Sequence, residues 1–139
     1  MPELPEVETV VRTLRTLVLG KTIERVSVTL PRIVRRPDDV EAFKAQLAGQ
    51  TIREIKRRAK FIQFFLDKDV LVSHLRMEGR YGLYQAEDPV EKHTHVIFHF
   101  TDGTELRYRY VRQFGTMDLF PIGMETSEGP LAKLGVEPL

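Results

Sequence analysis

The sequence predicts a mainly β fold with two helices: about eight antiparallel strands in a two-sheet sandwich or flattened barrel, with a long N-terminal helix packed against it. Two observations predict this class. Helical spacing of apolar residues is confined to two stretches, one at the N-terminus and a shorter one near residue 40. Short apolar or alternating runs, separated by turn residues, fill most of the remaining chain.

The first helix is predicted to begin at about Glu6. Pro5 suits a first helical turn, Glu6 and Glu8 favour the positive end of the helix dipole, and Gly20 stands where a C-cap glycine belongs. The apolar residues at helical spacing are Val7, Val10, Val11, Leu14, Leu17 and Val18. This stripe predicts a helix that docks on the sheets and holds the N-terminus in place.

A second helix is predicted from about Asp38 to Ala48, with an aspartate as its cap and Gly49 ending it. The clearest strand signals follow. Residues 61–66 are apolar on both faces, as in a strand buried within a sandwich, and Asp102-Gly103 is a two-residue hairpin signal between alternating runs. Further strands are predicted near Val26, Ile52, Leu71, Tyr81, Phe98, Tyr108 and Met117.

The length of 139 residues fits one domain, which we place at residues 1–122, with an exit linker at 123–139 toward further parts of a longer protein. No apolar run is long enough to span a bilayer, and the acidic N-terminus does not resemble a signal peptide. We therefore expect a cytoplasmic monomer without a membrane partner. Zero cysteines exclude disulfides and cysteine-ligated zinc within these residues.

Charge is unevenly distributed although the net charge is only +1. Residues 50–80 carry eight basic and four acidic side chains, and further arginines recur at 32, 35, 36, 107, 109 and 112. Two interpretations remain open: a salt-bridged, solvated surface, or a strip that neutralises phosphates.

The extreme N-terminus, "MPELPEVETVV", combines groups that could do chemistry. If Met1 is removed, Pro2 presents a secondary amine that can attack an electrophilic sugar carbon and form a Schiff base. Glu3 is close enough to act as general acid or base, and Glu6 could orient a substrate. The alternative is that both glutamates only favour a helix N-terminus.

"PELPEVE" resembles the N-terminal signature of the formamidopyrimidine-DNA glycosylase family, whose bacterial members excise oxidised purines such as 8-oxoguanine. Three later stretches support the resemblance in order: "RRAKFIQFFL", "SHLRMEGR" and "RYVRQFGTMDLF". The four motifs extend from residue 2 to about residue 120. They resemble the N-terminal catalytic domain only.

The resemblance implies a role for each matching residue. Pro2 would attack C1′ of the damaged nucleotide, and Glu3 would shuttle protons during base loss and β,δ-elimination. The remaining assignments are Glu6 for placement of the flipped base, Lys60 and His74 for the phosphates beside the lesion, with Lys60 also assisting the chemistry, and Met77, Arg112 and Phe114 for filling the hole left by the extruded base. A thioether, an arginine and an aromatic ring suit that purpose because they can wedge between bases or hydrogen-bond a base edge.

Each of these residues also has an ordinary structural interpretation. Met77 and Phe114 could be core residues, Lys60 a surface lysine, and His74 a hydrogen-bonded core histidine. Other histidines, at positions 93, 95 and 99, lack the cysteines or clustered carboxylates expected of a metal site. We expect no cofactor in this chain, because the zinc of the family belongs to its C-terminal part.

Three departures from the family pattern shape the expectations. The helix-two-turn-helix and zinc-finger parts are not among these residues, so we expect the 139 residues alone to bind DNA weakly and to excise little or nothing. Tyr110 stands where the family usually has aspartate, which leaves the pose of Arg112 and the opposite-base preference open. A retained Met1 would silence Pro2. The partner expected is double-stranded DNA containing oxidised purines, and the alternative function is a non-catalytic damaged-DNA-binding relative.

Overall fold

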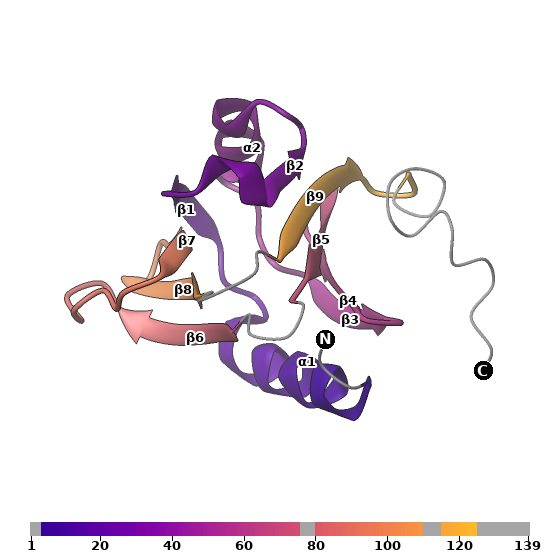
Figure 1. The fold of residues 1–139 in the computed structure, drawn as a ribbon, viewed down its shortest axis with the longest axis horizontal. Coiled ribbons are helices and arrows are strands. Elements are labelled where there is room, and N and C mark those ends of the chain that lie inside the picture. The colour runs from indigo at the N-terminus through magenta and orange to yellow at the C-terminus, as the bar shows by residue number, and fades with distance from the viewer. Residues whose placement is uncertain (1–3, 76–79, 110–114, 125–139) are drawn as a thin grey trace.

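The computed structural model describes residues 4–75, 80–109 and 115–124. These residues form two α-helices, one 3-10 turn (Pro31–Ile33) and nine strands in two sheets (Figure 1). The four-stranded sheet consists, in order, of β1 (Ile23–Val28), β7 (Thr94–Phe100), β8 (Thr104–Arg109) and β6 (Arg80–Gln85). The five-stranded sheet consists of β2 (Val34–Arg36), β9 (Thr116–Pro121), β5 (Asp69–His74), β4 (Phe61–Phe65) and β3 (Glu54–Arg58). The predicted fold class is confirmed.

The two helices close opposite edges of the sandwich (Figure 1). Helix α1 (Leu4–Val18) contacts the edge strands β3 and β6, one from each sheet, and α2 (Val40–Leu47) contacts the other two edge strands, β1 and β2. The α1 residues on the inner face are at most 2% exposed: Val7, Val11, Leu14 and Val18. Each helix therefore buries its apolar stripe against both sheets at once.

The helix ends agree with the sequence signals to within two residues. Helix α1 begins at Leu4 rather than Glu6, because Pro5 is compatible with the first turn. At α2 the Asp39 carboxylate accepts a hydrogen bond from the Glu41 backbone N–H at 3.0 Å, which makes Asp39 the N-cap.

One strand pairing differs from the all-antiparallel prediction. Strand β2 pairs in parallel with β9, through Val34 opposite Met117 and Arg36 opposite Asp118. Strand β2 is three residues long and directly follows a 3-10 turn, so it is too short for alternation to indicate it. Helix α2 contacts β2 and so covers this short edge strand.

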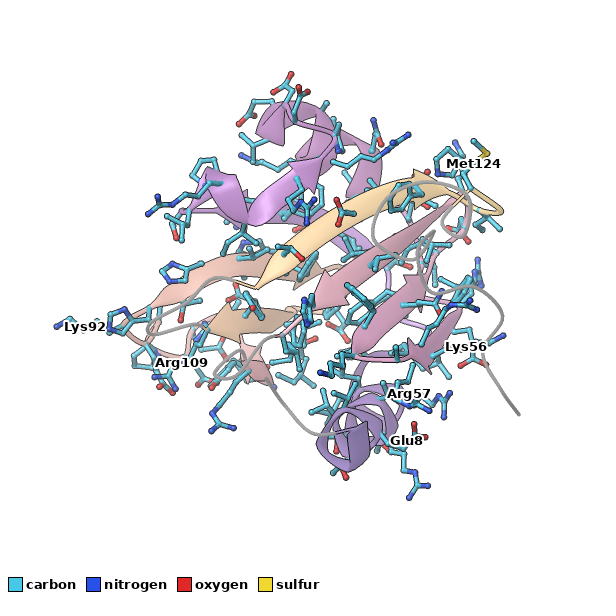
Figure 2. All side chains as sticks on the ribbon, turned by 45° about the vertical axis from the view of Figure 1, so that its right-hand side comes forward. Glu8, Lys56, Arg57, Lys92, Arg109 and Met124 are labelled. Carbon is cyan, nitrogen blue, oxygen red and sulfur yellow. The ribbon has the colours of Figure 1, made fainter. Side chains whose placement is uncertain are left out.

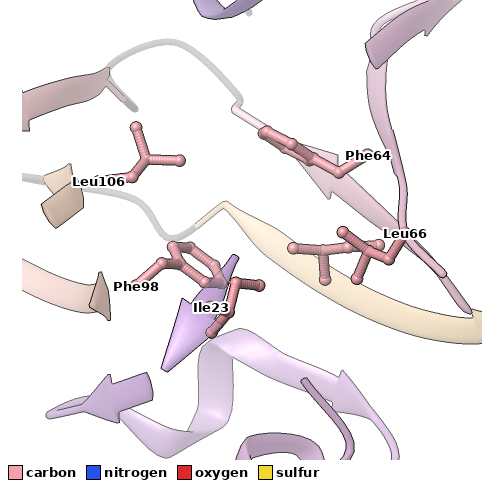
Figure 3. Close-up of a pocket in the computed structure, with 6 residues that line it drawn as sticks. Ile23, Phe64, Leu66, Phe98 and Leu106 are labelled. Atoms are coloured by element: carbon pink, nitrogen blue, oxygen red, sulfur yellow. The ribbon is translucent and has the colours of Figure 1, made fainter. Parts of the chain in front are cut away.

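The sheets enclose a continuous apolar core that contains a cavity of about 10 Å³ (Figure 3). Its lining is entirely apolar: Ile23, Phe64, Leu66, Leu71, Phe98 and Leu106. Such a space lacks polar partners for a water molecule and is far too small for a substrate. Groups that can do chemistry lie at the ends of strands instead.

A second apolar cluster lies on the outer face of the five-stranded sheet. Val70, Val72 and Phe120 are buried there, and Phe61 and Phe65 pack against them. Strand β4 therefore has apolar residues on both faces, as predicted for residues 61–66. Neither described helix has the length and apolarity to cross a membrane.

Candidate functional site

Four strand ends meet at one end of the sandwich, where the later motifs lie. Phe61 pairs with His74, and His74 pairs with Thr116, so β4, β5 and β9 are level there. The Ser73 and Tyr81 hydroxyls lie 2.6 Å apart and join β5 to β6, the two strands that flank residues 76–79. Burial raises the pKa of Tyr81, which therefore stays a neutral phenol in this bridge.

Gly115 lies directly before β9, beside Tyr108 of β8 and the backbone of His74 at the end of β5. A Cβ atom on this residue would collide with the Tyr108 hydroxyl and with the backbone oxygen of His74. The glycine of "RQFG" is therefore required by close packing at the start of β9. The sequence alone does not indicate this requirement, because Tyr108 and His74, which exclude a side chain, are not adjacent to Gly115 in sequence.

His74 packs within this end of the sheet. Its side chain is buried, and its ring centroid lies 4.7 Å from that of Phe61. Of the two interpretations from sequence, a packed histidine matches this burial. The role as a phosphate contact remains a prediction, which requires one ring edge to reach the nucleic acid.

Lys60 lies in the two-residue turn that joins β3 to β4. The preceding residue, Ala59, has a φ of 52°, a left-handed conformation that is unusual for a residue with a Cβ. The Arg57 guanidinium donates to the Ala59 carbonyl at 3.0 Å and stabilises this turn. Lys60 is half-buried, and no carboxylate of the described residues pairs with it.

The first turns of α1 are tied to the same turn. Arg57 Nε donates to Glu8 Oε2 at 2.9 Å, so one guanidinium contacts both the helix and the turn. Figure 2 shows Arg57 on β3 beside Glu8 on α1. The sequence does not indicate this contact, because the two residues are 49 positions apart. Each of them, taken alone, looks like an ordinary charged surface residue.

The basic strip is partly salt-bridged and partly open. Arg53 donates to Asp67 at 2.7 Å, and hydrogen bonds from the Thr51 backbone and from Arg53 hold the pKa of Asp67 below its usual value. Lys56 instead lies 5.3 Å above the Phe65 ring and pairs with no carboxylate of the described chain. Each of the two interpretations of the charge therefore fits part of the strip.

Most of the other predicted site residues lie outside the described chain: Pro2, Glu3, Met77, Arg112 and Phe114. Glu6 lies in α1, but its side chain is outside the description as well. The exit linker predicted at 123–139 and Tyr110 also fall there, apart from residues 123 and 124. Their roles remain predictions.

The predicted absence of a metal site concerns His93, directly before β7, and His95 and His99 within it. His99 Nδ1 lies 2.9 Å from Glu105 Oε2, and its Nε2 lies 2.8 Å from Ser27 Oγ, so both ring nitrogens have protein partners. Among the described residues, no group of three or more potential metal-ligating side chains gathers.

Residues 1–117 match the family described as the formamidopyrimidine-DNA glycosylase N-terminal domain. A formamidopyrimidine-DNA glycosylase of Brevibacillus brevis is 85% identical over all 139 residues, which cover 50% of that protein. One of Halalkalibacterium halodurans is 67% identical over 138 residues and is also covered to 50%. The chain thus spans about half the length of these relatives.

Solved structures of a Lactococcus lactis protein share the fold. Its complex with DNA containing FAPY-dG is 42% identical, with a TM-score of 0.82, and the match covers 88% of this chain and 45% of that one. Its complex with DNA containing an abasic site is also 42% identical, with a TM-score of 0.83 and the same coverage. Family match, sequence identity and shared architecture agree, and the chain belongs to the formamidopyrimidine-DNA glycosylase family as its N-terminal domain.

Proposed function

We propose that this domain supplies the chemistry of a bifunctional DNA glycosylase and apurinic/apyrimidinic lyase that removes 8-oxoguanine and formamidopyrimidines from double-stranded DNA. The activity is proposed for a chain of the relatives' full length, since the present one spans half of it. The observation that carries the proposal is the tie from the N-terminal end of α1 to the Lys60 turn, at 2.9 and 3.0 Å, within a domain of this family.

The reaction begins at Pro2 once Met1 is removed. The Pro2 nitrogen bonds to C1′ of the damaged nucleotide as the bond from C1′ to the base breaks, and the base leaves with that electron pair and takes up a proton. Glu3 moves the protons that open the sugar ring to the Schiff base and that drive β- and then δ-elimination of the flanking phosphates.

The lesion must leave the base stack before Pro2 can reach it. Extrusion costs a few kcal/mol of stacking and pairing, and Met77, Arg112 and Phe114 offset this cost by filling the vacated space. Arg112 hydrogen-bonds the orphaned cytosine, and Phe114 wedges beside it. Glu6 helps place the extruded base, while Lys60 and His74 contact the phosphates next to the lesion.

The partner is damaged duplex DNA. The structures of the Lactococcus lactis protein hold DNA with FAPY-dG or with an abasic site, which supports the same class of partner here. Action on chromosomal DNA accords with a cytoplasmic or nucleoid location in bacteria. No step assigned to these residues requires a metal or an organic cofactor, and the zinc of the family is assigned to the part beyond this domain.

The test is borohydride trapping on abasic-site duplex, with a full-length chain whose loss of Met1 is verified by intact mass. We expect a covalent adduct for the parent and strongly reduced excision of 8-oxoguanine for Glu3→Gln. Glu24→Gln is the matched control, because Glu24 is an exposed glutamate on β1. Salt-sensitive binding of the parent without any adduct would contradict the proposal and favour the non-catalytic relative.

A second measurement concerns the 139 residues alone. We expect weak duplex binding and little or no excision, because half of the length of the relatives is not included. Cleavage of an 8-oxoguanine duplex by this chain at the rate of the full-length protein would contradict that expectation.

A further inference from the structure

We propose that Arg57 is a positioning residue for the reaction: it fixes the Lys60 turn against the N-terminal end of α1, and so sets where Lys60 stands relative to the helix start that Pro2 and Glu3 precede in sequence. This inference rests on the proposed function. It assigns a role to a side chain that touches neither substrate nor reacting atoms.

The guanidinium of Arg57 makes two directed contacts with different elements. Nε donates to Glu8 Oε2 at 2.9 Å, and Nη1 donates to the Ala59 carbonyl at 3.0 Å. The side chain is 26% exposed and that of Glu8 is 38% exposed, so both lie at the boundary between protein and solvent. A planar guanidinium can hold two such acceptors in fixed directions, whereas a lysine ammonium acts as a point charge.

The contact with Ala59 bears directly on Lys60. The Ala59 carbonyl belongs to the same peptide plane as the Lys60 backbone nitrogen, so a hydrogen bond to that carbonyl orients the start of Lys60. Ala59 adopts a φ of 52°, a conformation that persists in a residue with a Cβ only where its surroundings hold it. Arg57 is one of the groups that hold it.

The contact with Glu8 positions the start of helix α1. Helix α1 runs antiparallel to β3, since Glu8 meets Arg57 while Arg15 Nε donates to the Ile55 carbonyl at 2.7 Å. The helix begins at Leu4, about one turn before Glu8. Arg57 is therefore the β3 contact nearer to the helix end that Pro2 and Glu3 precede in sequence.

A rate effect follows from this placement. If the helix end and the turn shift relative to each other by as little as 1 Å, a reaction that needs groups from both can lose as much as about 100-fold in rate. Binding of duplex DNA depends on many phosphate contacts and should change little. The expected signature is a loss in the chemical step with the dissociation constant preserved.

The experiment compares Arg57→Met and Arg57→Lys with Arg15→Met in the processed full-length chain. Arg15 is the matched control because it joins the same helix to the same strand farther from the helix start. Single-turnover rates of borohydride trapping on abasic-site duplex are measured together with duplex affinity and melting temperature. We expect a loss of about 10- to 100-fold in rate for Arg57→Met, a smaller loss for Arg57→Lys, and a change within about 2-fold for Arg15→Met.

Two further readouts separate positioning from general stability. Methylguanidinium should restore part of the rate of Arg57→Met at concentrations that leave its melting temperature unchanged. The exchange variant Glu8→Arg with Arg57→Glu restores an ion pair but offers no donor to Ala59, so its rate should stay low. Wild-type rates in either Arg57→Lys or the exchange variant would overturn the inference, even if Arg57→Met fails to fold.

The two proposals fail in distinguishable ways. A parent protein that forms no adduct refutes the proposed function, and the role of Arg57 falls with it. A parent that forms the adduct, together with Arg57 variants that react as fast as Arg15→Met, refutes the positioning role alone.

Discussion

The outer faces of the two sheets handle buried polar groups in opposite ways. On the four-stranded sheet, Arg107 is 1% exposed; its Nε donates a hydrogen bond to Glu105 Oε1 at 3.0 Å, and its Nη2 lies 2.9 Å from the same oxygen. On the five-stranded sheet, Asp118 is 4% exposed, and its buried Oδ2 has no hydrogen-bond partner among the described residues, beside the apolar cluster of Phe120. A buried charge is stabilising only where it is paired. Removing the charge should therefore lower the free energy of unfolding on the four-stranded face and raise it on the five-stranded face.

The four-stranded face is organised around the Arg107 guanidinium. It donates to the backbone oxygens of Gln85, Asp88 and Pro89 at 2.9–3.3 Å and stacks 4.7 Å from the Tyr84 ring. It therefore fastens the segment after β6 to the sheet. Glu105 continues the network to His99 and Ser27.

The largest effect is expected from Arg107→Met, which leaves Glu105 and three carbonyls without their donor. Breaking a buried pair by removing one partner costs about 3–5 kcal/mol, and urea unfolding at pH 7 should show a loss of that size. Arg25→Met is the control, because Arg25 is exposed and its contacts to Ser27 and His99 are 3.4 and 3.3 Å; we expect a change within about 0.5 kcal/mol. Equal effects of the two variants would contradict the comparison.

A gain in stability is expected from Asp118→Asn. Burial raises the pKa of Asp118, while the charges of Arg35 and Arg36 oppose the shift. Ionisation of Asp118 therefore lowers the stability of the fold as pH rises from 3.8, the ordinary pKa of an aspartate, through the raised pKa of the folded state. We expect Asp118→Asn to gain about 1–2 kcal/mol at pH 7 and little at pH 3, as measured by urea unfolding at both pH values.

Asp67→Asn should change stability in the opposite direction from Asp118→Asn. The Asp67 carboxylate accepts hydrogen bonds from the Thr51 backbone and from Arg53, so its loss should destabilise at pH 7. If Asp67→Asn, in the turn between β4 and β5, and Asp118→Asn, in β9, changed stability in the same direction, the contrast would be lost.

A smaller, pH-dependent effect is expected at His99. Burial and the charge of Arg25 lower the pKa of His99, although Glu105 opposes them. The contribution of neutral His99 to stability is complete above 6.5, the pKa of the unfolded state, and is lost as pH falls through the lowered pKa of the folded state. Thermal melting between pH 7.5 and 5 should fall less steeply for His99→Gln than for the parent; a steeper fall would contradict the assignment.

The smallest effect is expected at the β7–β8 hairpin. Hydrogen bonds from Lys21 and Thr104 lower the pKa of Asp102 to about 2. The stabilisation from these hydrogen bonds is present above pH 3.8, the usual pKa of an aspartate, and is lost as pH falls toward 2. Carboxyl titration by NMR should place Asp102 below other exposed aspartates, and Lys21→Met should raise its pKa.

The parts of the fold that sequence predicts well are those set by local chemistry. Asp102-Gly103 forms the expected hairpin, with Gly103 at a φ of 88°, and Asp39 caps α2 as its side chain allows. The apolar character of residues 61–66 on both faces indicated a strand with two buried sides, and the second apolar cluster explains it.

The contacts that sequence does not predict join distant segments. Arg57 and Glu8 were visible only as members of a basic run and an acidic helix start, and nothing local indicates that they pair. The partners of His99 come from β1 and β8, and its neighbours in sequence do not indicate them. Parallel pairing of β2 with β9 is also a long-range choice, which alternation within three residues cannot encode.

Helix α1 covers the seam between β3 and β6, and in sequence it directly follows the residues assigned to bond formation. Proteolytic trimming that removes this segment would uncover a strand edge in each sheet, and uncovered edges associate with one another. A trimmed chain would therefore be lost to aggregation or degradation. Under the proposed function, few folded but inert copies of this protein would then compete for damaged DNA.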